Sequence, residues 1–240
     1  MVVEGLVVGV VGVVLAVVHT WPMVRSLGTT VPDNTGDPMW ATWQLAWFGR
    51  LLRGGGGDFW SPPAFLGVSD NLAFTDVTLG YAPLALVSGE GFTGAVVQVN
   101  VAVLVAAALA FVGGYALARA VGARVPAALV VGAGFAFAPW RSGQVTHLNV
   151  YSIGGIALAL GLLVRGHGWS ARGGFRRDRV SPGWVLAGWV VAAWQLSLGF
   201  ATGIVFGYVL GLVVVLLLLG WVVRFGRGVP RAALVAEAVG

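Results

Sequence analysis

The chain of 240 residues contains no cysteine and no lysine, and only nine of its residues are acidic. Without cysteine, disulfides, thiol catalysis and thiolate metal sites are excluded. Charged residues make up 10% of the chain, whereas a soluble globular domain carries about 25%. A chain with so little polar surface cannot face water on all sides. Its recurring apolar runs are long enough to cross a bilayer, which takes roughly 20 residues, so the sequence predicts an all-α integral membrane protein.

Signatures of several enzyme classes are also missing. The sequence has no phosphate-binding P-loop, no Gly-x-Ser-x-Gly, no His-Glu-x-x-His and no dinucleotide-binding fingerprint. We therefore do not expect ATP-driven chemistry within this chain. The net charge of +5 does not indicate a nucleic-acid partner, because the arginines cluster in short loops between apolar runs, as membrane topology requires.

Six apolar runs are expected to span the membrane, and a seventh would begin at Ala232. Glycine and alanine are abundant in this chain, which suits helices that pack closely in lipid. The sequence thus predicts a polytopic helical bundle of about six to seven spans, forming a single transmembrane domain over residues 1–240. The six expected spans are 2–20, 95–118, 126–140, 148–165, 183–198 and 200–223.

The distribution of arginine predicts the orientation of this bundle. With the N-terminus in the cytoplasm, ten arginines fall in cytoplasmic segments and four in external ones, as the positive-inside rule requires. The run "RGHGWSARGGFRRDR" is then a cytoplasmic loop. Its simplest interpretation is a topology anchor beside anionic lipid.

The first external loop, at about residues 21–94, holds six of the nine acidic residues. Loops longer than about 12–15 residues are usually functional or disordered, and this one is too rich in Trp, Phe and Leu to be disordered. We expect a folded cap on the membrane surface. Its acidic residues are Asp33, Asp37, Asp58, Asp70, Asp76 and Glu90.

Two helices are predicted within this loop. Over 37–53, Trp40, Trp43 and Trp47 recur at helical spacing, and a tryptophan face suits a helix that lies in the membrane interface. A second helix is expected at about 77–87, bent at its internal proline.

Asp37 and Asp76 each precede one of these predicted helices, and each has two interpretations. Asp is a favoured helix N-cap, and Pro38 suits the first helical position. Alternatively, Asp37 is a carboxylate base at the mouth of a membrane cavity, and Asp76 joins it to share that role or to hold a divalent cation. The sequence does not show whether the two helices converge.

Arg141 and His147 follow the third expected span and are external on this topology. The planar fork of an arginine suits a phosphate, but an arginine beside Trp140 also suits simple anchoring at the interface. His147 is either a group that orients substrate or binds metal, or a polar residue satisfied at a helix start.

Five stretches together resemble the N-terminal half of a bacterial family of polytopic GT-C-type glycosyltransferase-like membrane proteins. They are "GDPMWATWQLAW", "FWSPPAF", "NLAFTDVTLGYAP", "FAFAPWRSGQVTHLN" and "WQLSLGF", and they cover most of residues 20–200. The resemblance implies a helical bundle in the bacterial cytoplasmic membrane, with interfacial helices in the first external loop. It also implies that the chain is the N-terminal part of a larger module, or that it works with a second chain.

The activity implied by the resemblance is transfer of a sugar from a polyprenyl-phosphate donor to an acceptor outside the cytoplasm. Asp37 matches the position of the family's external-loop base, and a metal held by Asp37 and Asp76 would fit the chemistry. The implied substrate-binding residues are Asp76, Arg141, His147, Trp40 and Tyr81.

The alternative is a protein without catalytic activity: a membrane scaffold, a transporter-type subunit or an inactive truncated relative. A transporter would place ionisable residues or broken helices near the middle of the membrane. The expected spans are almost free of charge, which counts against a transporter.

The first testable prediction concerns topology. The N-terminus and the loop 172–179 should be cytoplasmic, and Asp58 should be external, because arginine is concentrated on one side. Cysteine introduced at position 58 should react with a membrane-impermeant thiol reagent added from outside. Reaction from the cytoplasmic side alone would overturn the predicted topology.

Overall fold

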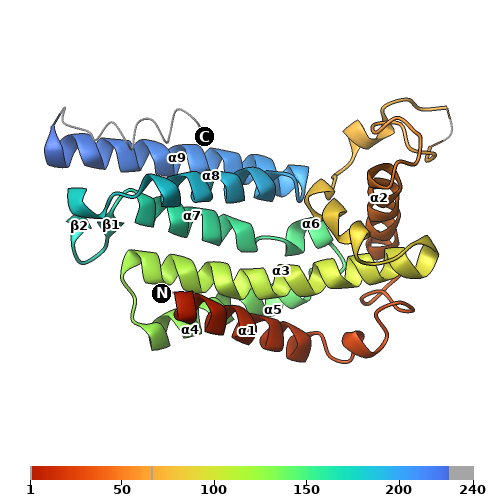
Figure 1. Ribbon diagram of the computed structural model, residues 1–240, viewed down its shortest axis with the longest axis horizontal. Helices are drawn as coiled ribbons and strands as arrows, with labels where there is room; N and C mark the ends of the chain where they lie inside the picture. Colours follow the sequence, from red (N-terminus) through yellow and green to blue (C-terminus); the bar gives the residue numbers. More distant parts are fainter. Residues whose placement is uncertain (1, 66, 227–240) are drawn as a thin grey trace. The chain divides into compact units, whose positions relative to one another are not determined.

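A computed structural model describes residues 2–65 and 67–226 of the chain, and nearly all of its regular structure is helical, as predicted (Figure 1). The two short strands pair in one antiparallel hairpin. The α-helices are α1 (Val2–His19), α2 (Asp37–Leu52), α3 (Gly91–Val121), α4 (Val125–Phe137), α5 (Pro139–Ser142), α6 (Leu148–Tyr151), α7 (Gly154–Gly166), α8 (Pro182–Leu196) and α9 (Phe200–Phe225). The strands are β1 (Trp169–Ser170) and β2 (Gly174–Phe175), and the 3₁₀ helices are η1 (Met23–Arg25), η2 (Asn71–Phe74), η3 (Leu79–Leu86) and η4 (Arg177–Arg179).

Every expected membrane span falls on helical structure. Among the described residues, three helical segments are long and apolar enough to cross a membrane: Gly91–Val121, Leu148–Gly166 and Phe200–Phe225. This indicates an all-α membrane protein. The full number of six to seven spans stays a prediction, and the expected seventh span from Ala232 lies outside the described residues.

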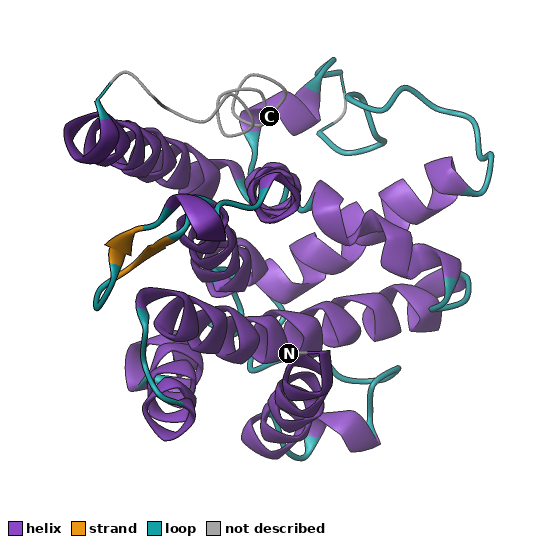
Figure 2. Ribbon diagram, turned by 60° about the vertical axis from the view of Figure 1, so that its left-hand side comes forward, coloured by secondary structure: helices purple, strands orange, loops and turns teal. Residues whose placement is uncertain are grey.

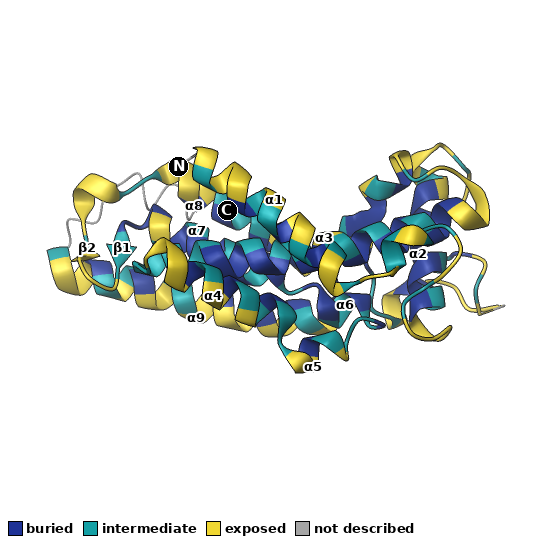
Figure 3. Ribbon diagram, turned by 90° about the horizontal axis from the view of Figure 1, so that it is seen from below, coloured by how far each residue is buried: buried dark blue, intermediate teal, exposed yellow. Residues whose placement is uncertain are grey.

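Many residues of α1 and α9 are exposed, drawn in yellow in Figure 3, and most of these exposed residues are apolar. Such continuous apolar surface is rare on water-soluble proteins and is expected of helices that contact lipid. On α1 these exposed residues are Val3, Leu6, Val7, Val10, Val13, Val14 and Val18, and on α9 they include Val205, Val209, Leu212, Leu216, Leu219 and Val223.

The chain divides into two compact units. The first comprises the described residues up to Ala108 together with Pro139–Ser152 and Ser197–Gly203, and the second comprises the remaining described residues. Helices α3 and α9 contribute residues to both.

In the first unit, α2 runs across the direction of α1 and packs against η3 (Figure 1). The tryptophan face that we expect to lie in the membrane interface is only partly buried within the protein. Trp47 is buried, but Trp40 and Trp43 are only half-buried, because the helix turns Leu45 and Phe48 inward instead. The remaining buried positions of α2 are Pro38, Ala41, Thr42, Gln44 and Gly49.

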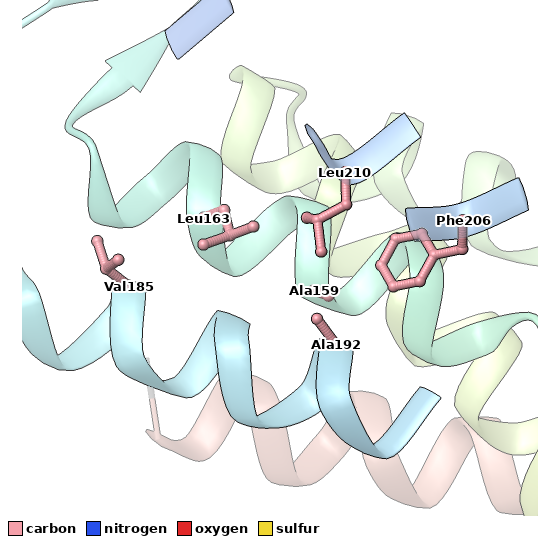
Figure 4. Packing of buried hydrophobic residues seen from close by; sticks show 6 residues of the cluster. All are labelled: Ala159, Leu163, Val185, Ala192, Phe206 and Leu210. Carbon is pink, nitrogen blue, oxygen red and sulfur yellow. The ribbon is translucent and has the colours of Figure 1, made fainter. Parts of the chain in front are cut away.

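In the second unit, α7 packs along α8, and α9 contributes two side chains to the shared core. This core contains Ala159, Leu163, Val185, Ala192, Phe206 and Leu210 (Figure 4). Figure 2 shows the β1–β2 hairpin, the one strand pair among the described residues, in orange.

A close approach of α3 to α7 depends on glycine. A Cβ added at Gly154 would lie 2.5 Å from the carbonyl carbon of Leu109 and 2.7 Å from its oxygen. Both are backbone atoms, so no side-chain rotation relieves the overlap. Small residues at such crossings let membrane helices pack backbone to backbone.

We expect Gly154→Ala to destabilise the protein by about 1–3 kcal/mol, the usual cost of overpacking. Gly134→Ala is the matched control, because Gly134 is also helical and a Cβ there meets nothing within 4 Å. Thermal unfolding in detergent should separate the two variants. Equal unfolding temperatures would contradict the close packing of α3 and α7.

Candidate functional site

Two carboxylates of the long loop and His147 line one cavity of about 360 Å³ in the first unit. Its walls come from the start of α2, from the segment before η3, and from the residues around the start of α6. The complete lining is Asp37, Trp40, Ala41, Gln44, Phe74, Thr75, Asp76, Thr78, Thr146, His147, Leu148 and Asn149. The structure thus brings Asp37, Asp76, His147 and Trp40 together, as the carboxylate hypothesis requires.

Asp37 is the first residue of α2 and Gly36 is the N-cap, so of the two interpretations of Asp37 the structure does not support the cap. The first helical hydrogen bonds run to the carbonyl of Gly36 from the N–H groups of Met39 and Trp40. The carboxylate is therefore available for another partner, while its negative charge still suits the positive end of the helix.

That partner is His147. Its Nε2 lies 3.0 Å from Asp37 Oδ2, and the two side chains are 44% and 60% exposed. A carboxylate can only accept a hydrogen bond, so Nε2 carries the proton in this pair. In a neutral ring Nδ1 is then an acceptor, and Thr146 Oγ1 lies 3.1 Å from it. The carboxylate of Asp37 and the hydroxyl of Thr146 thus orient the two nitrogens of the ring.

Asp76 does cap a helix, but not the one that we predicted. The following helix is a 3₁₀ helix that begins at Leu79, with Thr78 as its N-cap. Asp76 Oδ1 instead accepts a hydrogen bond of 2.8 Å from the backbone N–H of Ala201, in the first turn of α9. The partner of Asp76 in this hydrogen bond lies 125 residues away in the sequence, so the local sequence pattern could not predict the contact.

The other carboxylate oxygen of Asp76 contacts a neighbouring residue of the cavity lining, Asn149. Oδ2 accepts a hydrogen bond of 2.6 Å from Asn149 Nδ2, and the carbonyl of Asn149 accepts one of 3.2 Å from Thr202 Oγ1. Asp76 and Asn149 therefore hold the start of α9 against the start of α6. Asn149 was not predicted from the sequence, where its only local signal is its position two residues after His147.

Gln44 joins the two carboxylate-bearing segments and was also missed. It is 1% exposed, and its Nε2 donates 2.7 Å to the carbonyl of Asp76. Its Oε1 accepts from the Thr78 backbone N–H at 3.3 Å and from the Thr78 hydroxyl at 3.1 Å. The only sign of this role in the sequence is that Gln44 is a polar amide among the apolar residues of α2.

Arg141 does not reach the cavity. The side chain is completely buried, and Nη2 donates to the carbonyls of Tyr151 at 2.6 Å and Ala106 at 3.1 Å. Its guanidinium lies 3.8 Å from the centre of the Tyr151 ring. These contacts give Arg141 a structural role, which a ligand phosphate would have to disrupt.

Tyr81 is likewise placed outside the cavity lining. It is 2% exposed, and its hydroxyl lies 2.7 Å from the hydroxyl of Ser152. Burial raises the pKa of Tyr81. This hydrogen bond ties η3 to the segment after α6.

Trp40 gives the cavity an aromatic wall. It stacks on Trp43 with ring centres 4.9 Å apart and an interplanar angle of 18°. Phe65 packs on its ring at 5.7 Å, and Phe74 lines the same cavity. Aromatic faces beside carboxylates, amides and hydroxyls suit a sugar, which presents apolar C–H faces together with many hydroxyls.

A larger cavity of about 770 Å³ lies along another side of α2. Its lining includes Trp43, Arg50, Arg53, Glu90 and Gln98. Arg53 donates 2.8 Å to the carbonyl of Ala85 and lies 3.4 Å from Glu90. Gln98 is 2% exposed, and its Nε2 has no hydrogen-bond partner in the described part of the chain.

No group of three His, Asp or Glu side chains is placed to hold a metal ion within residues 2–65 and 67–226. A divalent cation between Asp37 and Asp76 therefore stays a prediction that rests on two carboxylates.

Comparison with known proteins places the chain in no family, because no family model, curated protein or solved structure matches it. Its chemistry has to be argued from the cavity itself.

The Asp76 contacts predict a graded effect on stability. Asp76→Ala removes the acceptor at the start of α9 and should cost about 0.5–2 kcal/mol, as for other lost caps. Asp76→Asn keeps one side-chain oxygen and should cost less. Glu90→Ala is a control, since it removes a largely exposed ion pair of small expected value. Chemical unfolding would test this order, and equal losses for Ala and Asn at position 76 would contradict the capping role.

Proposed function

We propose that the protein is a membrane glycosyltransferase, or part of one, which moves a sugar from a polyprenyl-phosphate donor to a hydroxyl acceptor. The observation that carries the proposal is the Asp37–His147 pair, at 3.0 Å, in a cavity that also contains Asp76 and Trp40. A volume of about 360 Å³ falls within the usual range of ligand pockets, about 300–1,000 Å³.

The pair supplies the base that sugar transfer needs. The acceptor hydroxyl loses its proton to Asp37, or to His147 Nδ1 once the acceptor hydroxyl replaces that of Thr146 there, and its oxygen forms the new bond to the anomeric carbon of the donor. The bond from that carbon to the phosphate oxygen breaks, and its electron pair leaves with the phosphate. A phosphate is a good leaving group, so the base matters more than an acid.

The departing phosphate also needs positive charge, and the described lining of the smaller cavity contains no arginine. A proton taken up by His147 would make its ring cationic. Arg50 and Arg53 supply further positive charge on the same helix, in the larger cavity. We propose that the donor phosphate approaches from there, past the stacked Trp40 and Trp43.

The membrane arrangement belongs to the same proposal. Six to seven spans, an N-terminus in the cytoplasm and a place in the bacterial cytoplasmic membrane would expose the cavity on the outer side, where lipid-linked sugars are used. Membrane lipid would surround α1 and α9, whose outer faces are apolar. A second chain or a C-terminal half would complete the module.

A scaffold without catalytic activity is the second candidate, and the bonds of Asp76 favour it. Both of its oxygens make structural contacts, to Asn149 and to the start of α9. Asp37 is the discriminating residue, because α2 does not use it as a cap.

We expect Asp37→Asn to lower sugar transfer by about 10²–10⁴-fold, since a lost general base has this typical cost. Stability should change little, because the side chain is 60% exposed and the cap is Gly36. The assay follows a radiolabelled polyprenyl-phosphate sugar in membranes that contain the protein, with its partner chain where one is required.

Asp70→Asn is the matched control. Asp70 is an exposed carboxylate of the same loop outside the cavity lining, and its φ of 52° suits Asn. It should keep wild-type activity. Transfer within a few-fold of wild type in Asp37→Asn would exclude Asp37 as the base and direct the same test to Asp76→Asn. Full activity in both variants, or no consumption of any lipid-linked donor, would favour the scaffold.

A further inference from the structure

A third cavity lies in the second unit, at the loop predicted to be cytoplasmic and the helix ends beside it. The cavity measures about 680 Å³, and five arginines line it. Arg119 comes from the last turn of α3 and Arg165 from the last turn of α7. Arg172, Arg176 and Arg179 come from the hairpin and the turn that follows it. The lining contains no acidic residue among the described residues.

Two of these arginines have structural contacts at helix ends. Arg119 Nη1 donates 2.7 Å to the carbonyl of Ala123, and the guanidinium of Arg165 lies 5.0 Å from the centre of the Trp184 ring. Cations near helix C-termini are favoured by the helix dipole. The helix ends thus account for Arg119 and Arg165 without any ligand.

Helix ends do not explain why the other three arginines of the lining, Arg172, Arg176 and Arg179, lie at the cavity. Arg176 makes two hydrogen bonds, of 2.8 and 3.1 Å, to the carboxylate of Asp178, which lower the pKa of Asp178. The side chains of Arg172 and Arg179 form no hydrogen bond or ion pair with any residue in 2–65 or 67–226. Residues 167–181 thus contain one carboxylate and four arginines, and three of these arginines line the cavity.

Backbone hydrogen bonds hold the loop arginines around the cavity. The N–H of Ala171 donates 2.9 Å to the carbonyl of Val121 at the end of α3, and the N–H of Arg176 donates 3.1 Å to the carbonyl of Gly168. Gly168 has a φ of +69°, and a Cβ there would lie 2.5 Å from the carbonyl oxygen of Arg176. The hairpin therefore has a defined place in the second unit, and its like charges converge in spite of their repulsion.

We propose that this cavity binds a phosphorylated anion, either the headgroup of an anionic lipid or a free phosphate compound. A cleft lined by charges of one sign concentrates the opposite ion, and the planar fork of arginine matches phosphate oxygens. The hydroxyls of Ser170 and Ser181 in the wall are further donors. The site does not depend on the Asp37 cavity or on its proposed chemistry.

The direct test is titration of the purified full chain with inorganic pyrophosphate in nanodiscs of pure phosphatidylcholine. Calorimetry should show saturable binding, and the double variant Arg172→Gln/Arg179→Gln should weaken it by about tenfold or more, as expected for hydrogen bonds to charged groups. Both residues are exposed, and their side chains form no hydrogen bond or ion pair with the described residues, so the variant should fold. The circular dichroism spectrum and the unfolding temperature of the double variant should match those of wild type. The single variant Arg172→Gln should weaken pyrophosphate binding less than the double variant does.

The matched control is Arg124→Gln/Arg224→Gln. It removes the same charge from exposed arginines that are also expected to be cytoplasmic but do not line the cavity. Its affinity for pyrophosphate should stay within about two- to threefold of wild type, the effect of a distant exposed charge screened by salt.

A second arm distinguishes the two sources of phosphate. If a lipid headgroup occupies the cavity, nanodiscs containing phosphatidic acid should abolish pyrophosphate binding to wild type, whereas phosphatidylcholine nanodiscs retain it. Undiminished binding in both kinds of nanodisc identifies a free phosphate compound. The proposal is overturned if pyrophosphate does not bind in phosphatidylcholine, or if the two double variants lose affinity equally.

Discussion

The candidate site depends on the buried amide of Gln44. This side chain is the link between α2, which carries Asp37, and the loop segment that carries Asp76, through hydrogen bonds to Asp76 and Thr78. Each bond is worth only about 0.5–1.5 kcal/mol net, but an unpaired buried partner costs about 1–3 kcal/mol. Moving the loop away from Gln44 would leave buried polar groups unpaired, and this costs more free energy than the hydrogen bonds contribute.

The helical character of the chain was predictable from the sequence, because a segment that crosses lipid has to satisfy its backbone polar groups within a helix. Apolar runs such as 200–223 accordingly appear as helices. Within the loop, the helix at 37–53 was predicted nearly to its ends, since a proline after Asp37 and a glycine run after Arg53 mark both boundaries. The buried face of this helix could not be predicted, because packing against η3 decides which side of the helix turns inward.

The candidate site was predictable only in part. Asp37 and His147 stood out as polar residues beside helix starts, and the structure pairs them. The roles of Asp76 and Arg141 depend on partners distant in sequence: the start of α9 for Asp76, and the carbonyl of Ala106 for Arg141. A phosphate-binding arginine and an arginine that binds backbone carbonyls look alike in sequence, since the guanidinium serves both through the same donors. Burial separates the two cases, and burial is a property of the fold.

The partial exposure of the Asp37–His147 pair has a kinetic consequence for a transferase. With 60% and 44% of these side chains exposed, bulk water would reach the same proton acceptor as a sugar hydroxyl would, and water is present at far higher concentration. Partition between hydrolysis and transfer would then be set by how completely the bound acceptor seals the opening. The molecule that receives the sugar would form the missing wall of the cavity. The preference for transfer over hydrolysis would then exist only while the acceptor is bound.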